Sequence, residues 1–162
     1  MLNKMYVSAI GQDSHRFEPL GSSKPLLLGG VIINGHRGLM GNSDADVILH
    51  AVTNAISGIS GVNILGKISD DLCLKQGITD SRVYLSEALK TLGAWKLVHV
   101  SISVEARRPH LAEHIGEIRH SIASLLSLAI ENVGLTATSG EGLTEFGKGE
   151  GMQALVIVSA CK

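Results

Sequence analysis

Hydrophobic residues follow the two-residue repeat of β-strands in several short stretches of the chain. Residues 5–10 and 155–160 each predict a strand, and the alternation within 98–104 predicts a half-buried one. Two apolar runs on either side of a Gly-Gly pair predict a hairpin over 26–33. The polar sequence 12–18 is therefore expected to begin where the first strand ends.

Three longer segments have apolar residues at helical spacing. The first helix is expected over 43–58, with Ser43 or Asp44 as its N-cap. The second is expected over 80–93, and the third, over 111–129, is expected to be the longest. Strands and helices are thus interleaved in one layer each, which predicts an α/β fold, an α+β sandwich.

Two segments show no regular repeat. Residues 61–77 have no clean period and predict a long loop, of the kind that often covers an active site. Residues 136–151 combine hydroxyls, glycines, a lysine and acids, which suits phosphate and a hard cation. Glu141 in this segment is a candidate magnesium ligand. The alternative is a glycine-rich turn between two strands.

Composition limits the classes of function. A chain of 162 residues that is 44% hydrophobic is expected to form a single domain over 1–162. A net charge of -1 and only 3% aromatic residues argue against nucleic acid as a partner. No apolar run or signal sequence indicates a membrane or secretion, so we expect a soluble, cytoplasmic protein. Cys73 and Cys161 are expected to be small buried hydrophobes.

Asp13, His15 and His50 form the candidate metal site. Asp13 and His15 are two residues apart in an extended segment, so both side chains point the same way. Either signal alone is weak, because Asp-x-His is a common triplet and a lone histidine on an apolar helix face is usually a core residue. Together they make a three-ligand zinc set with an open fourth position, which favours catalysis. Asp46, one turn before His50, is expected to orient its imidazole.

Five segments of the sequence, in chain order, resemble one known family, the 2-C-methyl-D-erythritol 2,4-cyclodiphosphate synthases of the non-mevalonate isoprenoid pathway. The matching motifs are Gly-Gln-Asp-Ser-His-Arg-Phe at 11–17, Leu-Gly-Gly-Val at 28–31, Ser-Asp-Ala-Asp-Val at 43–47 with His50, Thr-Asp-Ser at 79–81, and the segment 137–151. The resemblance implies one mixed sheet of about four strands, a small hairpin and three main helices on one face of the sheet. It also implies a homotrimer whose sheets face its centre and whose active sites lie between subunits.

The same resemblance implies a lyase reaction. The substrate would be 4-diphosphocytidyl-2-C-methyl-D-erythritol 2-phosphate, whose 2-phosphate attacks the β-phosphate to close a cyclic diphosphate and release CMP. Zinc would be bound by Asp13, His15 and His50, and magnesium or manganese by Glu141. Ser139 would stabilise the transition state.

The resemblance also assigns residues to the substrate. Cytidine would bind at 106–112 and 137–139, and the erythritol part at Asp13 and the loop 61–73. The complete set expected to bind substrate is Asp13, His15, Asn42, Ser43, Ile64, Leu65, Gly66, Asp71, Ala106, Pro109, His110, Leu111, Ala137, Thr138, Ser139, Glu141, Glu145 and Lys148.

The sequence departs from the family at several of these positions. Asn42 replaces a histidine assigned to transition-state stabilisation, and His110 replaces a lysine. Near the trimer axis, Glu145 replaces a phenylalanine and Lys148 an arginine. Two alternatives therefore stay open beside the cyclase: a zinc-dependent phosphohydrolase, and a non-catalytic trimeric binding protein of the same fold.

Overall fold

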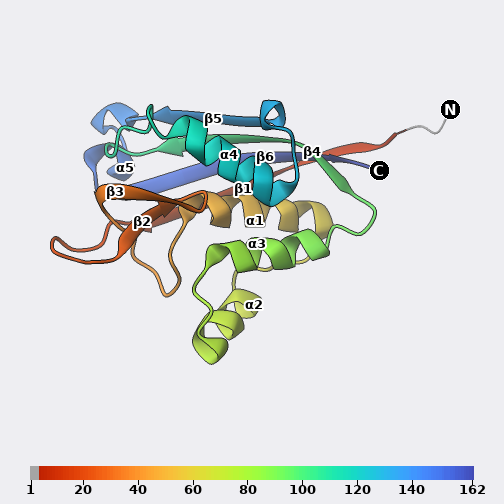
Figure 1. The fold of residues 1–162 in the computed structure, drawn as a ribbon, viewed down its shortest axis with the longest axis horizontal. Coiled ribbons are helices and arrows are strands. Elements are labelled where there is room, and N and C mark those ends of the chain that lie inside the picture. The colour runs from red at the N-terminus through yellow and green to blue at the C-terminus, as the bar shows by residue number, and fades with distance from the viewer. Residues whose placement is uncertain (1–3) are drawn as a thin grey trace.

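A mixed four-stranded sheet forms one layer of the computed structural model, which describes residues 4–162 (Figure 1). The strand order is β1 (Tyr6–Arg16), β6 (Gly151–Cys161), β4 (Lys96–Glu105) and β5 (Val133–Thr138). Strand β6 runs antiparallel to both β1 and β4, and β4 runs parallel to β5. The predicted mixed sheet is confirmed.

A separate hairpin consists of β2 (Pro25–Leu28) and β3 (Val31–Arg37). Gly29 and Gly30 form its turn with φ angles of 62° and 81°. Positive φ at both central residues is typical of the tight turn that matches strand twist, and glycine adopts it without steric cost. The predicted hairpin is confirmed.

The three predicted helices exist and lie on the same side of the sheet (Figure 1). Helix α1 (Val47–Ser60) packs against β1 and β6, and α4 (Ile115–Leu126) packs against β5. Helix α3 (Ser81–Lys90) packs mainly against α1, so the helices form two tiers rather than the single layer predicted. Ten of the residues of α1 are buried because the sheet covers one side of the helix and α3 the other.

Several boundaries differ from those predicted. Helix α1 begins after Asp46, which is its N-cap, and it is longer than α4. Helix α4 is shorter than predicted because Ser127 adopts a left-handed conformation and ends it. Strand β1 continues to Arg16 and therefore includes part of the polar sequence 12–18. This strand lies at the edge of the sheet, where polar residues are tolerated.

Short elements account for the remaining differences. Much of the predicted loop 61–77 is helical, in α2 (Lys67–Asp70) and a π-helical turn (Asp71–Lys75), both too short to show a period. Strand β5 was not predicted from the sequence. The other short helical turns are Ile130–Asn132, Gly140–Gly142 and α5 (Glu145–Lys148).

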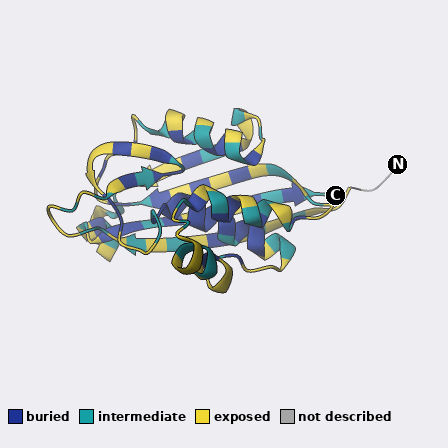
Figure 2. Cartoon of the chain, turned by 60° about the horizontal axis from the view of Figure 1, so that its bottom comes forward, coloured by how far each residue is buried: buried dark blue, intermediate teal, exposed yellow. Residues whose placement is uncertain are grey.

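No element among residues 4–162 covers the opposite face of the sheet in the single chain. Along β1 and β6, less exposed positions alternate with more exposed ones, as Figure 2 shows for the strands. On the uncovered face, Ile10 is 68% exposed and Ile157 is 49% exposed. Within residues 4–162, no helix has the length and hydrophobicity needed to cross a membrane.

Candidate active site

The side chains of Asp13, His15 and His50 converge on one point, on the side of the sheet that the helices cover. Asp13 Oδ2 lies 2.8 Å from His15 Nε2 and 3.0 Å from His50 Nδ1, and these two nitrogens are 3.2 Å apart. A tetrahedral zinc ion with bonds of about 2.0–2.1 Å needs ligand atoms about 3.3 Å apart. The three side chains therefore fit such an ion with small movements. In the part of the chain that the structure describes, this is the one group of three such ligands.

The close approach of β1 and α1 brings these ligands together. Asp13 and His15 lie on the face of β1 toward α1, on which His50 is buried. A Cβ atom on Gly11 would lie 2.0 Å from the carbonyl oxygen of Ala51 and 2.4 Å from the amide nitrogen of Ala55. Only glycine permits this contact, so Gly11 sets the distance between the strand and the helix.

The charges of the cluster depend on one another. Burial tends to raise the pKa of Asp13, but hydrogen bonds and charges from His15 and His50 lower it to about 2. Burial tends to lower the pKa of His15, whereas the hydrogen bond and charge of Asp13 raise it above its ordinary value. Asp13 therefore remains ionised at neutral pH, as a metal ligand must be.

Each histidine has a partner on the ring nitrogen that points away from the cluster. His15 Nδ1 lies 2.8 Å from the carbonyl oxygen of Met40, which can only accept, so Nδ1 carries the hydrogen and Nε2 faces the cluster. His50 Nε2 lies 2.8 Å from Ser81 Oγ and 3.4 Å from Ser43 Oγ. Sequence reasoning missed Ser81, although it lies in the Thr-Asp-Ser motif at 79–81.

The prediction that Asp46 orients His50 is wrong. The Asp46 carboxylate instead accepts hydrogen bonds from the backbone amides of Gly29 (2.9 Å) and Gly30 (2.6 Å) in the hairpin. It also accepts from Ile48 (3.1 Å) and Leu49 (3.0 Å) at the start of α1. Asp46 is completely buried, and its role is to cap α1 and fix the hairpin to that helix.

One cavity surrounds the three-ligand cluster. Its lining consists of Asp13, His15, Gly41, Asn42, Ser43, His50, Leu65, Ser69, Asp70, Cys73 and Tyr84. Three of the residues assigned to the substrate, Asn42, Ser43 and Leu65, thus lie beside the cluster. Cys73 is half-buried in this lining, and Cys161 is also half-buried, so neither is the fully buried hydrophobe predicted.

Three other residues assigned to the substrate, Ile64, Gly66 and Asp71, do not line this cavity. The side chain of Ile64 is 2% exposed and packs in the core. Asp71 Oδ1 forms an ion pair of 2.7 Å with Lys75, and Asp70 lines the cavity instead. Gly66 is the N-cap of α2, where its amide donates to Ser69 Oγ at 3.0 Å.

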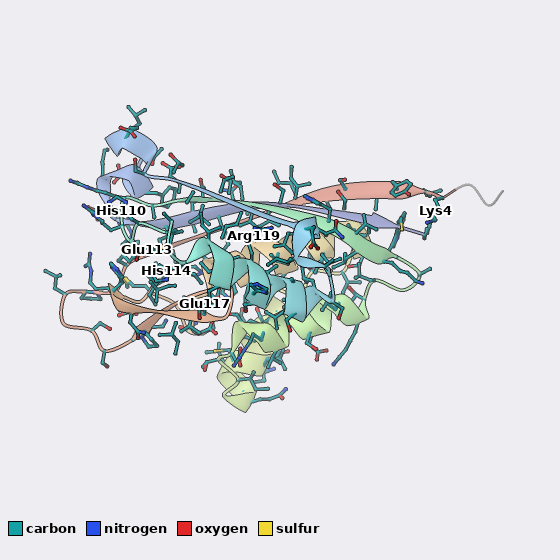
Figure 3. The ribbon with its side chains drawn as sticks, turned by 45° about the horizontal axis from the view of Figure 1, so that its top comes forward. Lys4, His110, Glu113, His114, Glu117 and Arg119 are labelled. Atoms are coloured by element: carbon teal, nitrogen blue, oxygen red, sulfur yellow. The ribbon has the colours of Figure 1, made fainter. Side chains whose placement is uncertain are left out.

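The residues assigned to cytidine line a second cavity, between β4, β5 and the start of α4. Those that share its lining are Ala106, Pro109, His110, Leu111, Ala137, Thr138 and Ser139. An adjoining cavity includes His110, Ser139 and Glu141 together with Arg107 and Arg108, which sequence reasoning did not single out. Figure 3 shows His110 at the end of the sheet where α5 lies, with Glu113 and His114 just before α4 and Glu117 in its first turn.

The glycine-rich segment is ordered by local contacts. Ser139 Oγ lies 3.2 Å from Glu141 Oε1, and Thr144 Oγ1 donates to the Glu105 carboxylate. Glu145 and Lys148 form an exposed ion pair of 2.7 Å on α5, which holds the pKa of Glu145 below and that of Lys148 above their ordinary values. No residue of the cavities at Ser139 and Glu141 also lines the cavity of the three-ligand cluster.

The chain is similar to known proteins over nearly its whole length. The YgbB family model matches residues 6–160. The 2-C-methyl-D-erythritol 2,4-cyclodiphosphate synthase of Chlamydia caviae is 45% identical over 159 residues, which are 98% of this chain and 90% of that protein. The bifunctional IspDF from Campylobacter jejuni superposes with a TM-score of 0.88 at 31% identity, over 98% of this chain and 43% of that chain.

A second solved structure contains a nucleotide. It is a 2C-methyl-D-erythritol-2,4-cyclodiphosphate synthase in a form bound to CDP, with a TM-score of 0.72 and 30% identity, over 94% of this chain and 98% of that chain. The family match and the relatives agree with the motifs read from the sequence. The chain belongs to the YgbB family, the family of the 2-C-methyl-D-erythritol 2,4-cyclodiphosphate synthases.

Proposed function

We propose that this enzyme converts 4-diphosphocytidyl-2-C-methyl-D-erythritol 2-phosphate to 2-C-methyl-D-erythritol 2,4-cyclodiphosphate and CMP. The observation that carries the proposal is the metal-ligand cluster of Asp13, His15 and His50 in a chain of this family. An oxygen of the 2-phosphate attacks the β-phosphorus. The bond from that phosphorus to the oxygen bridging to the α-phosphate breaks, and CMP leaves with that oxygen. No water enters the product.

Zinc at the cluster and magnesium or manganese at Glu141 would supply Lewis-acid stabilisation of charge on the phosphate oxygens. The fit for zinc rests on the spacing of the three ligand atoms. The protein's own residues hold the two phosphates in line for attack, which is the main requirement of phosphoryl transfer. The Ser139 hydroxyl and the Asn42 amide would donate hydrogen bonds to phosphate oxygens. The position of Asn42 beside the cluster and that of Ser139 beside Glu141 support these roles.

The nucleotide would occupy the cavity between β4, β5 and the start of α4. Ala106, Pro109, Leu111 and Ala137 give this cavity apolar walls suited to a base. Backbone groups and Thr138 offer the hydrogen bonds that identify cytosine. The CDP-bound relative supports a cytidine nucleotide as the ligand.

We infer that the two halves of this site come from neighbouring copies of the chain. The three-ligand cluster and the Ser139–Glu141 region line separate cavities in a single chain. The uncovered face of the sheet, with Ile10 and Ile157 exposed, offers an apolar surface for contact between copies. We therefore extend the proposal to a cytoplasmic homotrimer of single-domain chains, with each active site between neighbouring subunits, acting on a small molecule.

Phosphorus NMR of the reaction tests the proposal. The substrate is incubated with the enzyme and magnesium, with and without a chelator. We expect signals of a cyclic diphosphate and CMP, which the chelator abolishes. Linear phosphates alone, with oxygen-18 incorporated from labelled water, would show a phosphohydrolase instead. No turnover in the parent, with turnover restored by Asn42→His, would show that the natural chain is a non-catalytic binding protein.

A further inference from the structure

His50, Ser81 and Asp44 form a chain of polar contacts. The chain begins at His50 Nε2, the ring nitrogen that points away from Asp13 and His15. Ser81 Oγ lies 2.8 Å from His50 Nε2 and also contacts the Asp44 carboxylate. The backbone amide of Ser81 donates to the other oxygen of Asp44 at 3.0 Å. Ser81 is completely buried and His50 nearly so, which means that water does not replace the contact between them.

The direction of each hydrogen bond follows from the number of hydrogens available. A serine hydroxyl has one hydrogen to donate, and an ionised carboxylate only accepts. Ser81 therefore donates to Asp44, and its remaining lone pairs face His50. To make a hydrogen bond with Ser81, His50 must carry its hydrogen on Nε2. Ser43 Oγ, at 3.4 Å from the same nitrogen, is too distant to compete.

We propose that Ser81 and Asp44 are positioning residues that hold His50 as its Nε2–H tautomer and so make Nδ1 the metal-binding atom. Nδ1 is the nitrogen that lies 3.0 Å from Asp13 Oδ2 and 3.2 Å from His15 Nε2. The inference rests on the metal site of the proposed function. It assigns to Ser81 and Asp44 the role that the sequence suggested for Asp46.

Asp44 is itself held rigidly. Its carboxylate accepts the amide hydrogen of Asp46 at 3.1 Å as well as that of Ser81, and its own amide donates to the carbonyl oxygen of Thr79 at 2.8 Å. These bonds join the turn before α1 to the first residue of α3. The negative charge of Asp44, transmitted through the Ser81 hydroxyl, strengthens the bond that His50 would form to a metal. Helix α3 thus contributes to the metal site without touching the metal.

Metal affinity tests this proposal without substrate. Zinc binding is measured by competition with a chromophoric chelator for the parent chain, Ser81→Ala, Ser81→Thr and Asp44→Asn. Loss of such a partner typically weakens metal binding by about 10–100-fold, and we expect this for Ser81→Ala. Ser81→Thr keeps the hydroxyl and is expected to recover most of the affinity. Ser57→Ala, which changes another buried serine that does not contact the site, should stay within about threefold of the parent.

Asp44→Asn tests the direction of the hydrogen bonds. The new amide can donate to Ser81 Oγ, which leaves the serine hydrogen free to turn toward His50 Nε2. That reversal favours a hydrogen on Nδ1, so zinc affinity should fall at least as far as in Ser81→Ala. Equal affinities for the parent, Ser81→Ala and Asp44→Asn would overturn the proposal.

Nitrogen-15 NMR of the zinc-loaded parent shows which ring nitrogen of His50 carries the hydrogen, and it tests the proposal even if a variant fails to fold. We expect His50 to show a hydrogen on Nε2 and metal coordination through Nδ1, and the reverse pattern would overturn the proposal. The outcomes also separate this inference from the function it rests on. A parent that binds no zinc refutes the metal site itself, whereas a parent that binds zinc but forms no cyclic product refutes only the cyclase reaction.

Discussion

His15 Nε2 and His50 Nδ1 lie 3.2 Å apart although the two residues are 35 positions apart in the chain. One residue belongs to a strand and the other to a helix, and each ring is fixed by a hydrogen bond on its other nitrogen. Two such nitrogens facing one carboxylate form a site that is assembled before any metal binds. A preassembled site loses little conformational entropy on binding.

Replacing His50 tests the cluster directly. We expect His50→Ala to lose most bound zinc and cyclase activity while keeping the fold, because alanine favours the helix in which His50 lies. Zinc content after dialysis, turnover and circular dichroism measure the three effects. His120→Ala is the matched control, since it removes an exposed histidine from helix α4. Full zinc occupancy in His50→Ala would refute the ligand assignment.

Gly11 is expected to be intolerant of even a methyl group. In Gly11→Ala the added Cβ would meet the backbone of α1 at Ala51, so the helix must move away from β1. Overpacking of this kind costs about 1–3 kcal/mol, and the movement would also separate His50 from Asp13. We expect a lower midpoint of thermal unfolding together with weaker zinc binding.

Gly134→Ala serves as the control for that substitution. Gly134 also lies in a strand, but a Cβ there would meet its neighbours at 3.8 Å, an ordinary contact. Its stability and zinc affinity should therefore stay close to those of the parent. If the two variants behave alike, the close approach at Gly11 does not set the geometry of the site.

The pH dependence of metal binding follows from the charges of the cluster. Asp13, with a pKa of about 2, stays ionised throughout the neutral and mildly acidic range. The pKa of His15 lies above its ordinary value of 6.5, so in the metal-free protein this residue keeps its proton to a higher pH than a free histidine does. Zinc must displace that proton.

Zinc affinity should therefore fall as the pH is lowered through the raised pKa of His15, and stop changing once His15 is fully deprotonated at higher pH. Calorimetry in buffers with different ionisation enthalpies would detect the released proton. The same measurement on Asp13→Asn should show less proton release near pH 7, because the carboxylate that raises the pKa of His15 is gone. Identical proton release in both proteins would contradict this coupling.

Asp46 should matter for stability rather than for metal binding. Asp46→Ala removes the N-cap of α1 and leaves four backbone amides without their acceptor in the interior. Loss of a cap costs about 1 kcal/mol and an unsatisfied buried donor about 1–3 kcal/mol, so we expect a loss of about 2–4 kcal/mol. Asp80→Ala, which removes the more exposed cap of α3, should cost only about 1 kcal/mol. Denaturant unfolding measures both.

Elements with a local cause were predictable from the sequence. The Gly-Gly turn fixes the β2–β3 hairpin, and the helical spacing of apolar residues within 43–58 indicates α1. Asp13 and His15 were found because alternate residues of a strand share a face. By contrast, β5 escaped notice since Gly134 and two threonines interrupt its short apolar pattern, and it pairs with β4 alone.

Contacts between distant segments could not be predicted in the same way. Ser81 contacts His50, which lies 31 positions earlier in the chain. No local sequence pattern indicates that a serine contacts a distant histidine. The spacing of four residues between Asp46 and His50 suggested a contact on one helix face, but Asp46 stands before the first turn, where backbone amides without helical partners take its carboxylate. The role of Asp46 was therefore decided by the backbone amides around it and not by its helical spacing from His50.

Mixing inactive variants tests whether each active site lies between subunits. His50→Ala damages the metal cluster and Glu141→Ala damages the other cavity, and neither chain alone should turn over substrate. In a trimer assembled at random from equal amounts of both, about a quarter of the sites would combine an intact cluster with an intact neighbouring cavity. Coexpression should therefore restore about a quarter of the parent activity. His15→Ala coexpressed with His50→Ala should restore none, because both changes fall in the same half. If His50→Ala with Glu141→Ala is as inactive as His15→Ala with His50→Ala, each active site is built from one chain.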